Sequence, residues 1–314
     1  MAQPSTREVE HQIKVHAPAG QIYRFIAEVA NWPRIFPPSV HVEYLERGDA
    51  EERIQIWATA NGEPKTWTSR RTLDPAARRI DFRQEKSQNP LAAMGGAWVI
   101  EPLSDEESLV RLLHDYRAID DDPEKLEWIA KAVDRNSQAE LAALKANAEL
   151  ATDTPDLLLT FTDTVQVGGS AKDVYDFINE ANLWAERLPH VAKVKMTEDA
   201  PGLQLLEMDT RTKDGSTHTT RSVRVTFPHD RIAYKQIELP PLMTVHTGEW
   251  AFAENPGGVL VSSRHTVAIN EPNITKILGA DAGVPEAREF VRDVLGKNSL
   301  TTMGRAKEYA ESRA

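Results

Sequence analysis

The stretch IYRFIAEVANWPRIFPP, residues 22–38, has a counterpart in VYDFINEANLWAERLPH, residues 174–190. Four matched residues, a tyrosine, a phenylalanine, a tryptophan and a proline, are each separated from their counterparts by 152 residues. The same offset relates the segments GGAW and TGEW, which end at Trp98 and Trp250, and an Asn-Ser pair recurs with an offset of 162 near the end. Repeated agreement in the same order indicates that the chain consists of two copies of one domain.

The joint between the copies lies in ANAELATDTPDLL, residues 146–158, where a helical pattern gives way to small and polar residues and a proline. We therefore predict one domain over residues 1–153 and a second over residues 154–314. Each copy has about 150 residues, which is enough to bury a hydrophobic core of its own.

Within each copy the sequence patterns follow one order. A short strand opens the copy, two helical segments follow, and a long run of alternating residues is divided by turn signals such as LDPAAR and ENPGG. Each copy closes with a long helix, over about 123–148 and 284–310. One strand, two helices, six strands and a long helix predict an α+β domain in which a curved antiparallel sheet wraps around the closing helix.

The composition describes a globular chain with 40% apolar residues and a mean hydropathy of −0.47. No segment approaches the roughly 20 apolar residues of a membrane span, and the start lacks the apolar run of a signal peptide, so we expect a cytoplasmic protein. A net charge of −11 argues against nucleic-acid binding. The chain has no cysteine, no histidines at metal-ligand spacing and no nucleotide-binding glycine motif, so we expect neither a metal nor a cofactor.

A second signal is the strand pattern WTSRRTL, residues 67–73. Alternate side chains of a strand share one face, so Trp67, Ser69 and Arg71 would lie together. An indole, a hydroxyl and a guanidinium on one face fit the wall of a polar cavity better than a plain core. In the second copy, the strand HTTRSVRV shows the same pattern with an offset of 150, which pairs Ser69 with Thr219 and Arg71 with Arg221.

The strand before the first closing helix reads LVRLLHDYRAID, residues 109–120. His114 and Tyr116 lie on the same face as Leu112, so they point inward if Leu112 does. A lone inward-facing histidine is usually a core residue with a partner. Because the face that carries Arg71 belongs to a neighbouring part of the same sheet, a role of His114 in a pocket is an equal alternative.

The corresponding strand of the second copy reads SSRHTVAIN. Arg264 and His265 fall on opposite faces of it, and the alternation does not decide which of them faces the interior.

Polar residues interrupt the apolar stripe of each closing helix. They are Asn136, Ser137 and Glu140 in the first helix, and Asn298 and Thr302 in the second. An unpaired buried polar group costs about 1–3 kcal/mol, so these residues need partners, water or a ligand. They predict a polar cavity beneath each helix. The alternative is that the helix simply leaves the core at this point.

Four more arginines, Arg70, Arg78, Arg79 and Arg83, fall in turns or on the exterior face of the same segment. On an acidic chain they predict a local basic patch, which would dock an acidic partner.

These features together resemble the di-domain aromatase/cyclases of bacterial type II polyketide synthases. The resemblance rests on the tandem copies, NWP or LWAERLP after the first helix, WxSxR on a middle strand, a GxW strand and Asn-Ser on the closing helix. Those enzymes belong to the helix-grip superfamily, which includes START and Bet v 1 domains. The resemblance implies a sheet that grips a long C-terminal helix, with a deep pocket between them and no cofactor.

The resemblance also implies a reaction. The substrate would be a poly-β-ketone on an acyl carrier protein, and the product an aromatic ring formed by first-ring aldol cyclisation, typically from C7 to C12, and dehydration. The pathway would be antibiotic biosynthesis, and the partners would be the carrier protein and other synthase subunits, with a homodimer left open. One domain would cyclise and the other aromatise, or one would be largely structural. A non-catalytic carrier of a hydrophobic ligand is the alternative.

Roles for individual residues follow from the resemblance. Arg71 and Arg221 would stabilise the enolate or alkoxide, and His114, Tyr116 and His265 would move protons. The substrate-binding positions would be Trp32, Trp67, Ser69, Asn136, Ser137, Glu140, Trp184, Thr219, Asn298 and Thr302.

Overall fold

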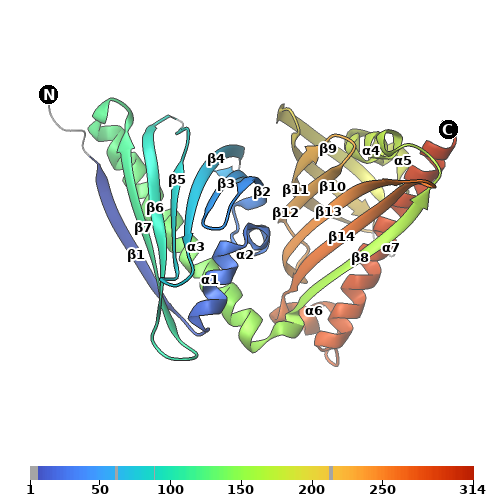
Figure 1. The fold of residues 1–314 in the computed structure, drawn as a ribbon. Helices are drawn as coiled ribbons and strands as arrows, with labels where there is room; N and C mark the ends of the chain where they lie inside the picture. The colour runs from blue at the N-terminus through green and yellow to red at the C-terminus, as the bar shows by residue number, and fades with distance from the viewer. Residues whose placement is uncertain (1–5, 61–62, 88, 212–214) are drawn as a thin grey trace. The chain divides into compact units, whose positions relative to one another are not determined.

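The computed structural model describes residues 6–314 except 61–62, 88 and 212–214 (Figure 1). The chain divides into two compact units, Met1–Pro155 and Asp156–Ala314. The division falls two residues beyond the boundary expected at residue 153. Each unit is described by itself below, as the first and the second domain.

The first domain contains a seven-stranded antiparallel sheet in the order β1-β7-β6-β5-β4-β3-β2. Its helices are α1 (Ala19–Ala27), α2 (Trp32–Ile35) and the closing helix α3 (Pro123–Asp153). Its strands are β1 (Arg7–Val15), β2 (Ser39–Arg47), β3 (Glu51–Ala60), β4 (Glu63–Asp74), β5 (Arg79–Gln84), β6 (Leu91–Pro102) and β7 (Ser108–Ala118).

The second domain repeats this order with a sheet β8-β14-β13-β12-β11-β10-β9. Its helices are α4 (Ala171–Asn179), α5 (Trp184–Arg187), α6 (Ile274–Leu278) and the closing helix α7 (Val284–Glu311). Its strands are β8 (Leu158–Val167), β9 (Val191–Ala200), β10 (Leu203–Arg211), β11 (Thr217–Phe227), β12 (Arg231–Glu238), β13 (Met243–Asn255) and β14 (Gly258–Ile269). The predicted α+β class is confirmed, and so is the predicted element order, except for the additional short helix α6 of the second domain.

Helix α6 has no counterpart in the first domain, where β7 leads to α3 within a few residues. The added segment explains why the offset between the copies rises from 152 to 162 before the closing helix.

The closing helix α3 begins where its sequence provides a cap. The Asp122 carboxylate accepts hydrogen bonds from the backbone N–H groups of Glu124 and Lys125, and Pro123 occupies the first helical position. Its buried residues follow helical spacing: Ile129, Val133, Ser137, Leu141, Leu144 and Ala148. A polar serine therefore lies in the middle of an otherwise apolar stripe.

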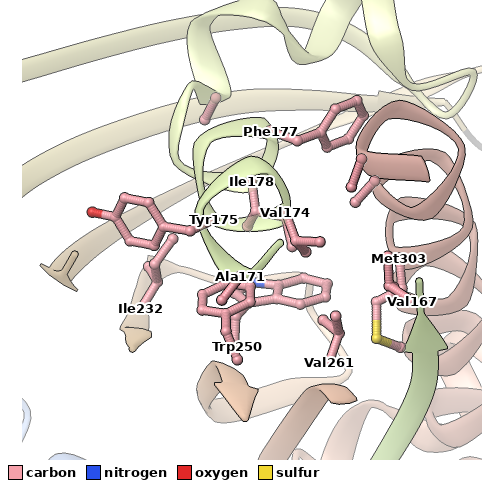
Figure 2. Packing of buried hydrophobic residues seen from close by; sticks show 14 of the residues in the cluster. Val167, Ala171, Val174, Tyr175, Phe177, Ile178, Ile232, Trp250, Val261 and Met303 are labelled. Carbon is pink, nitrogen blue, oxygen red and sulfur yellow. The ribbon is translucent and has the colours of Figure 1, made fainter. Parts of the chain in front are cut away.

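In each domain the core lies between the sheet, the first helix and the closing helix. Figure 2 shows this in the second domain, where Val174 and Ile178 of α4 face Trp250 of β13, with Met303 of α7 beside them. In the first domain, Ile22 and Ile26 of α1 share one cluster with residues of the sheet and α3, which include Trp98, Leu112, Leu141 and Leu144. The tryptophan of the GxW segment therefore belongs to the core of both copies.

Candidate active site

Arg71 of β4 is buried, with 2% of its surface exposed. Its Nη2 donates hydrogen bonds to the backbone carbonyls of Ala27, at 2.9 Å, and Ile26, at 3.3 Å, where α1 ends. The same nitrogen lies 3.6 Å from Oε2 of the buried Glu52 on β3, and the guanidinium lies 5.3 Å from the centre of the Trp32 ring. Burial lowers the pKa of Arg71, and the Glu52 carboxylate opposes that shift.

Two donors of this guanidinium have no hydrogen-bond partner among the described residues, namely Nε and Nη1 of Arg71. A buried donor without a partner is costly, so such groups are usually satisfied by water or a ligand. The guanidinium can therefore anchor α1 through Nη2, while Nε and Nη1 can each donate to water or to a substrate oxygen.

The counterpart of Arg71 is Arg224, and the prediction that Arg221 takes this role is wrong. Arg71 pairs with Phe82 across the sheet, and Arg224 pairs with Tyr234, which is the equivalent residue of β12. Nη2 of Arg224 donates to a carbonyl at the end of α4, that of Ile178, at 2.9 Å. The side chain of Arg224 is buried.

Arg221 and Thr219 lie elsewhere. The Arg221 side chain is 39% exposed and lies 3.9 Å from Glu207, while the exposed Thr219 donates to Asp209 at 2.7 Å. The alternating hydroxyl and guanidinium pattern fits β11 in two ways, with either Arg221 or Arg224 as the counterpart of Arg71. The pairing of β11 with β12 contains a bulge after Arg221, and the observed register makes Arg224, three residues further along, the counterpart.

His114 connects β7 to the closing helix. Its Nδ1 lies 3.3 Å from Oγ of the buried Ser137, and the Phe82 ring meets the imidazole edge-on at 5.6 Å. Burial lowers the pKa of His114 to about 4, with a smaller contribution of the same sign from His11. The imidazole is therefore neutral at neutral pH.

Glu140 lies one helical turn after Ser137 on α3. Its side chain is partly buried and makes no hydrogen bond or ion pair with the described residues. Burial raises the pKa of Glu140 to about 7, so the carboxyl is protonated in about half of the molecules near neutral pH. Asn136, by contrast, is exposed, so the prediction that it joins the inward-facing group is wrong.

Three other predicted residues of the first domain have structural partners. The buried Ser69 donates through Oγ to the carbonyl of Arg83 at 3.0 Å, and Trp67 packs against the cluster that contains Ile54 and Ile56. Nε1 of Trp32 donates to the carbonyl of Ile26 at 3.0 Å. These residues shape the interior near Arg71.

Tyr116 is fully buried, and its hydroxyl has no hydrogen-bond partner among the described residues. It packs with Ile129 and Val133 beneath the first turns of α3, rather than against Ser137.

In the second domain His265 faces the interior and Arg264 is exposed. The structure thus answers which of these two residues points inward, a question that the sequence alternation left open. His265 pairs with Gly248 across the sheet, as His114 pairs with Gly96. A Cβ on Gly248 would collide with the ring of Tyr234, so glycine is required there.

The imidazole of His265 is held on both sides. Nε2 lies 2.7 Å from Oγ of Ser299, and Nδ1 lies 2.9 Å from Nε2 of His246 and 3.1 Å from the hydroxyl of Tyr234. Burial lowers the pKa of His265 to about 4 and also holds the pKa of His246 well below its usual value. Every polar atom of the His265 ring therefore has a protein partner.

Thr302 occupies the position in α7 that Glu140 occupies in α3. It is buried, and its hydroxyl donates to the backbone carbonyl of Asn298 at 2.9 Å within the helix. Trp184 is also buried, with the Arg224 guanidinium 5.3 Å from its ring centre. The interior of the second domain thus has no carboxyl at the Glu140 position.

The predicted basic patch is not net positive. Arg79 forms an ion pair with Asp81 at 2.6 Å, Arg83 with Asp115 at 2.7 Å, and Arg70 lies 3.0 Å from Glu85. Arg70, Arg79 and Arg83 line a recess of about 620 Å³ whose walls also include Glu8, Glu10 and His114. Arg70, Arg79 and Arg83 are paired with acidic neighbours, so these three arginines do not leave the local excess of positive charge that the sequence predicted.

In the described part of the chain, no group of three or more histidine, aspartate or glutamate residues could hold a metal ion. Among the helices described, none is long and apolar enough to cross a membrane.

Comparisons with known proteins match the chain over both domains. A family model described as polyketide cyclase / dehydrase and lipid transport matches residues 6–149 and again residues 159–311. The granaticin polyketide synthase bifunctional cyclase/dehydratase of Streptomyces virginiae is 52% identical over 300 residues, which are 94% of this chain and 97% of that protein. The actinorhodin polyketide synthase bifunctional cyclase/dehydratase of Streptomyces coelicolor is 45% identical over 320 residues, which cover 99% of each.

Two solved structures match nearly the whole chain. The di-domain ARO/CYC BexL is 64% identical with a TM-score of 0.93, and the alignment covers 97% of this chain and 99% of that one. The di-domain ARO/CYC StfQ from the steffimycin biosynthetic pathway is 37% identical with a TM-score of 0.89 and the same coverage.

Proposed function

Because the chain belongs to the polyketide cyclase and dehydrase family, we propose that its first domain performs regiospecific first-ring aldol cyclisation of a poly-β-ketone, joining C7 to C12. The same site then dehydrates the new ring to an aromatic one. The substrate is presented by an acyl carrier protein, within an assembly of polyketide synthase subunits. The chain is thus a polyketide aromatase/cyclase, and the finer assignments rest on the geometry of the first domain.

The observation that carries the proposal is a pair of titratable groups with shifted pKa values, one on β7 and one on α3, where the two elements meet at Ser137. His114 is neutral with a pKa of about 4, and Glu140 is partly protonated with a pKa of about 7. Two groups whose pKa values are pushed apart can act as base and acid at the same pH. Ser137 contacts His114, and Glu140 follows Ser137 by one helical turn on α3.

The steps follow from these protonation states. With Nδ1–H of His114 donating to Ser137, Nε2 has a free lone pair and takes a proton from a methylene between two carbonyls. The resulting enolate carbon attacks the distant carbonyl carbon, and Glu140 protonates the alkoxide that forms. His114 then returns its proton through solvent, so that Glu140 is again protonated and His114 is again a free base. Glu140 donates a proton to the new hydroxyl, which leaves as water, while His114 removes the second proton of the same methylene, and this gives the ring its new double bond.

Arg71 supports the charge that develops on oxygen. Its Nε and Nη1 have no partners among the described residues, and it is fixed by the end of α1, so the guanidinium is held before the substrate arrives. Donors placed in advance at a developing oxyanion contribute about 10²–10³ in rate.

We assign a supporting role to the second domain. The His265 ring is bonded on both nitrogens, and Thr302 replaces the carboxyl. The polar network of the second domain therefore stabilises its own core, and His265 lacks the free nitrogen that a base needs.

The test uses the full chain and a carrier-linked poly-β-ketone, with products analysed by mass. Glu140→Ala should leave the linear chain or its unaromatised aldol product, while the matched change Thr302→Ala in the second domain should give the aromatic product as before. If the two variants give the same product distribution as the unaltered chain, the first domain does not use Glu140. Binding without any conversion by the unaltered chain would favour the alternative of a hydrophobic-ligand carrier.

A further inference from the structure

A recess of about 480 Å³ lies between β1 and the first half of α3 in the first domain. Val9 and His11 of β1, Tyr116 of β7, and Ala130 and Asp134 of α3 line it. No step of the mechanism above uses it.

Two buried polar atoms at this recess have no hydrogen-bond partner among the described residues. One is the hydroxyl of Tyr116, whose side chain is fully buried, and the other is Nδ1 of His11. Asp134 Oδ1 lies 2.9 Å from Nε2 of His11, and with a single ring proton on Nε2, donated to this carboxylate, Nδ1 has a free lone pair. The recess therefore offers one hydrogen-bond donor and one acceptor.

Tyr116 lines the recess with its side chain fully buried. Burial is the main cause of the raised pKa of the Tyr116 phenol. The charge of Arg7 lowers this pKa, and the charge of Glu127 raises it. Both of these residues line the recess and lie 4.0 Å apart.

The second domain fills the equivalent space. Phe161 takes the place of Val9 and lies against His265 with ring centres 4.9 Å apart, just as Val9 pairs with His114 across the sheet. Arg292 takes the place of Ala130, lies 4.3 Å from the centre of the Phe161 ring and pairs with Asp163 at 2.6 Å.

The small Val9 and Ala130 therefore leave open a volume that a phenylalanine and an arginine close in the other copy. This difference points to a ligand that enters only the first domain.

The charges at the recess compensate one another, which limits the ligand class. Glu127 pairs with Arg7 and also with Lys131, at 3.5 Å, and Glu10 pairs with Arg111 at 2.7 Å. A phosphate or a metal ion would find no excess charge of opposite sign. An uncharged, oxygen-rich chain fits better, because a ketone oxygen accepts from Tyr116 and an enol hydroxyl donates to His11.

We propose that this recess is a binding subsite for the part of the poly-β-ketone that lies beyond the ring-forming carbons. The proposal rests on the proposed function, since the keto-enol chain would extend past Val9, which pairs with His114 across the sheet. It makes Tyr116 and His11 chain-binding residues, and Asp134 a residue that positions His11.

The test measures binding of two non-cyclising mimics to the full chain by calorimetry, a short one with a single β-diketone unit and a long one with several. Tyr116→Phe should weaken the long mimic about 3- to 10-fold, the value of one hydrogen bond, and leave the short mimic unchanged. Its thermal midpoint should stay the same or rise, because the change removes an unpartnered buried hydroxyl.

A second variant closes the recess without touching Tyr116. Val9→Phe with Ala130→Arg introduces the side chains of the second domain and should abolish the preference for the long mimic. Ala139→Arg adds the same charge at an exposed position of α3 and should bind both mimics as the unaltered chain does.

Equal losses for the two mimics in Tyr116→Phe, or no loss for either, would overturn the subsite while the proposed function stands. Failure of the unaltered chain to bind either mimic would overturn both.

Discussion

The imidazole of His114 and the hydroxyl of Ser137 join the last strand of the first sheet to its closing helix, with 3.3 Å between Nδ1 and Oγ. His265 and Ser299 make the same junction in the second domain, but through Nε2, at 2.7 Å. The two rings therefore turn opposite nitrogens toward the helix. His114 keeps Nε2 available, while Nδ1 of His265 is occupied by its neighbours.

The first prediction separates these two pairs. His114→Ala should lower the cyclisation rate by about 10²–10⁴, the range for a lost general base, and Ser137→Ala should lower it less because Ser137 only orients the ring. Ser299→Ala should instead lower the thermal midpoint, because it leaves a buried nitrogen of His265 with one partner fewer. The measurements are single-turnover rates and thermal unfolding. Equal rate losses in the Ser137 and Ser299 variants would contradict the division of roles.

The second prediction concerns Arg71 and Glu52, which lie 3.6 Å apart and are both buried. Arg71→Ala should destabilise the protein, but by less than the roughly 3–5 kcal/mol expected for a buried carboxylate with no countercharge, because Nε of Arg47 still lies 3.4 Å from Oε1 of Glu52. The double variant Arg71→Met with Glu52→Gln should recover most of this loss in chemical unfolding and yet remain inactive. Activity in the folded double variant would show that the guanidinium only stabilises the fold.

The third prediction is a loss of stability in acid. The pKa of His265 is about 4 in the folded protein, against about 6.5 in an unfolded chain, so the unfolded state binds more protons between these values. Stability should therefore be complete above about pH 6.5 and fall by roughly 3 kcal/mol toward pH 4 on account of this group. In His265→Asn, chemical unfolding should start from a lower stability and show a shallower decline. An unchanged slope would exclude His265 as a source of the acid sensitivity.

The sequence predicts the architecture because the duplicated pattern carries two copies of the same information. Tyr23 and Tyr175, like Trp98 and Trp250, are core residues at equivalent places, so one register fits both sheets. The inward direction of His114, Ser137 and the partly buried Glu140 also follows from strand and helix periodicity.

Other parts of the site could not be found in this way. Alternation along HTTRSVRV allows two registers, and only the pairing of Arg224 with Tyr234 selects the correct one. The sequence does contain one indication of the correct register. An aromatic residue, Phe82 or Tyr234, lies four residues after the turn that follows β4 or β11. The contact between His11 and Asp134 links residues 123 positions apart, which no local pattern reveals.

The measurement that tests the central claim most directly is the pH dependence of aromatisation by the full chain, on a carrier-linked substrate in single turnover. A neutral His114 with a pKa of about 4 and a protonated Glu140 with a pKa of about 7 predict a rate that falls below about pH 4 and again above about pH 7. Glu140→Gln should be slower throughout and should lose the fall above about pH 7. The same alkaline fall in this variant as in the unaltered chain would contradict the assignment of Glu140 as the acid.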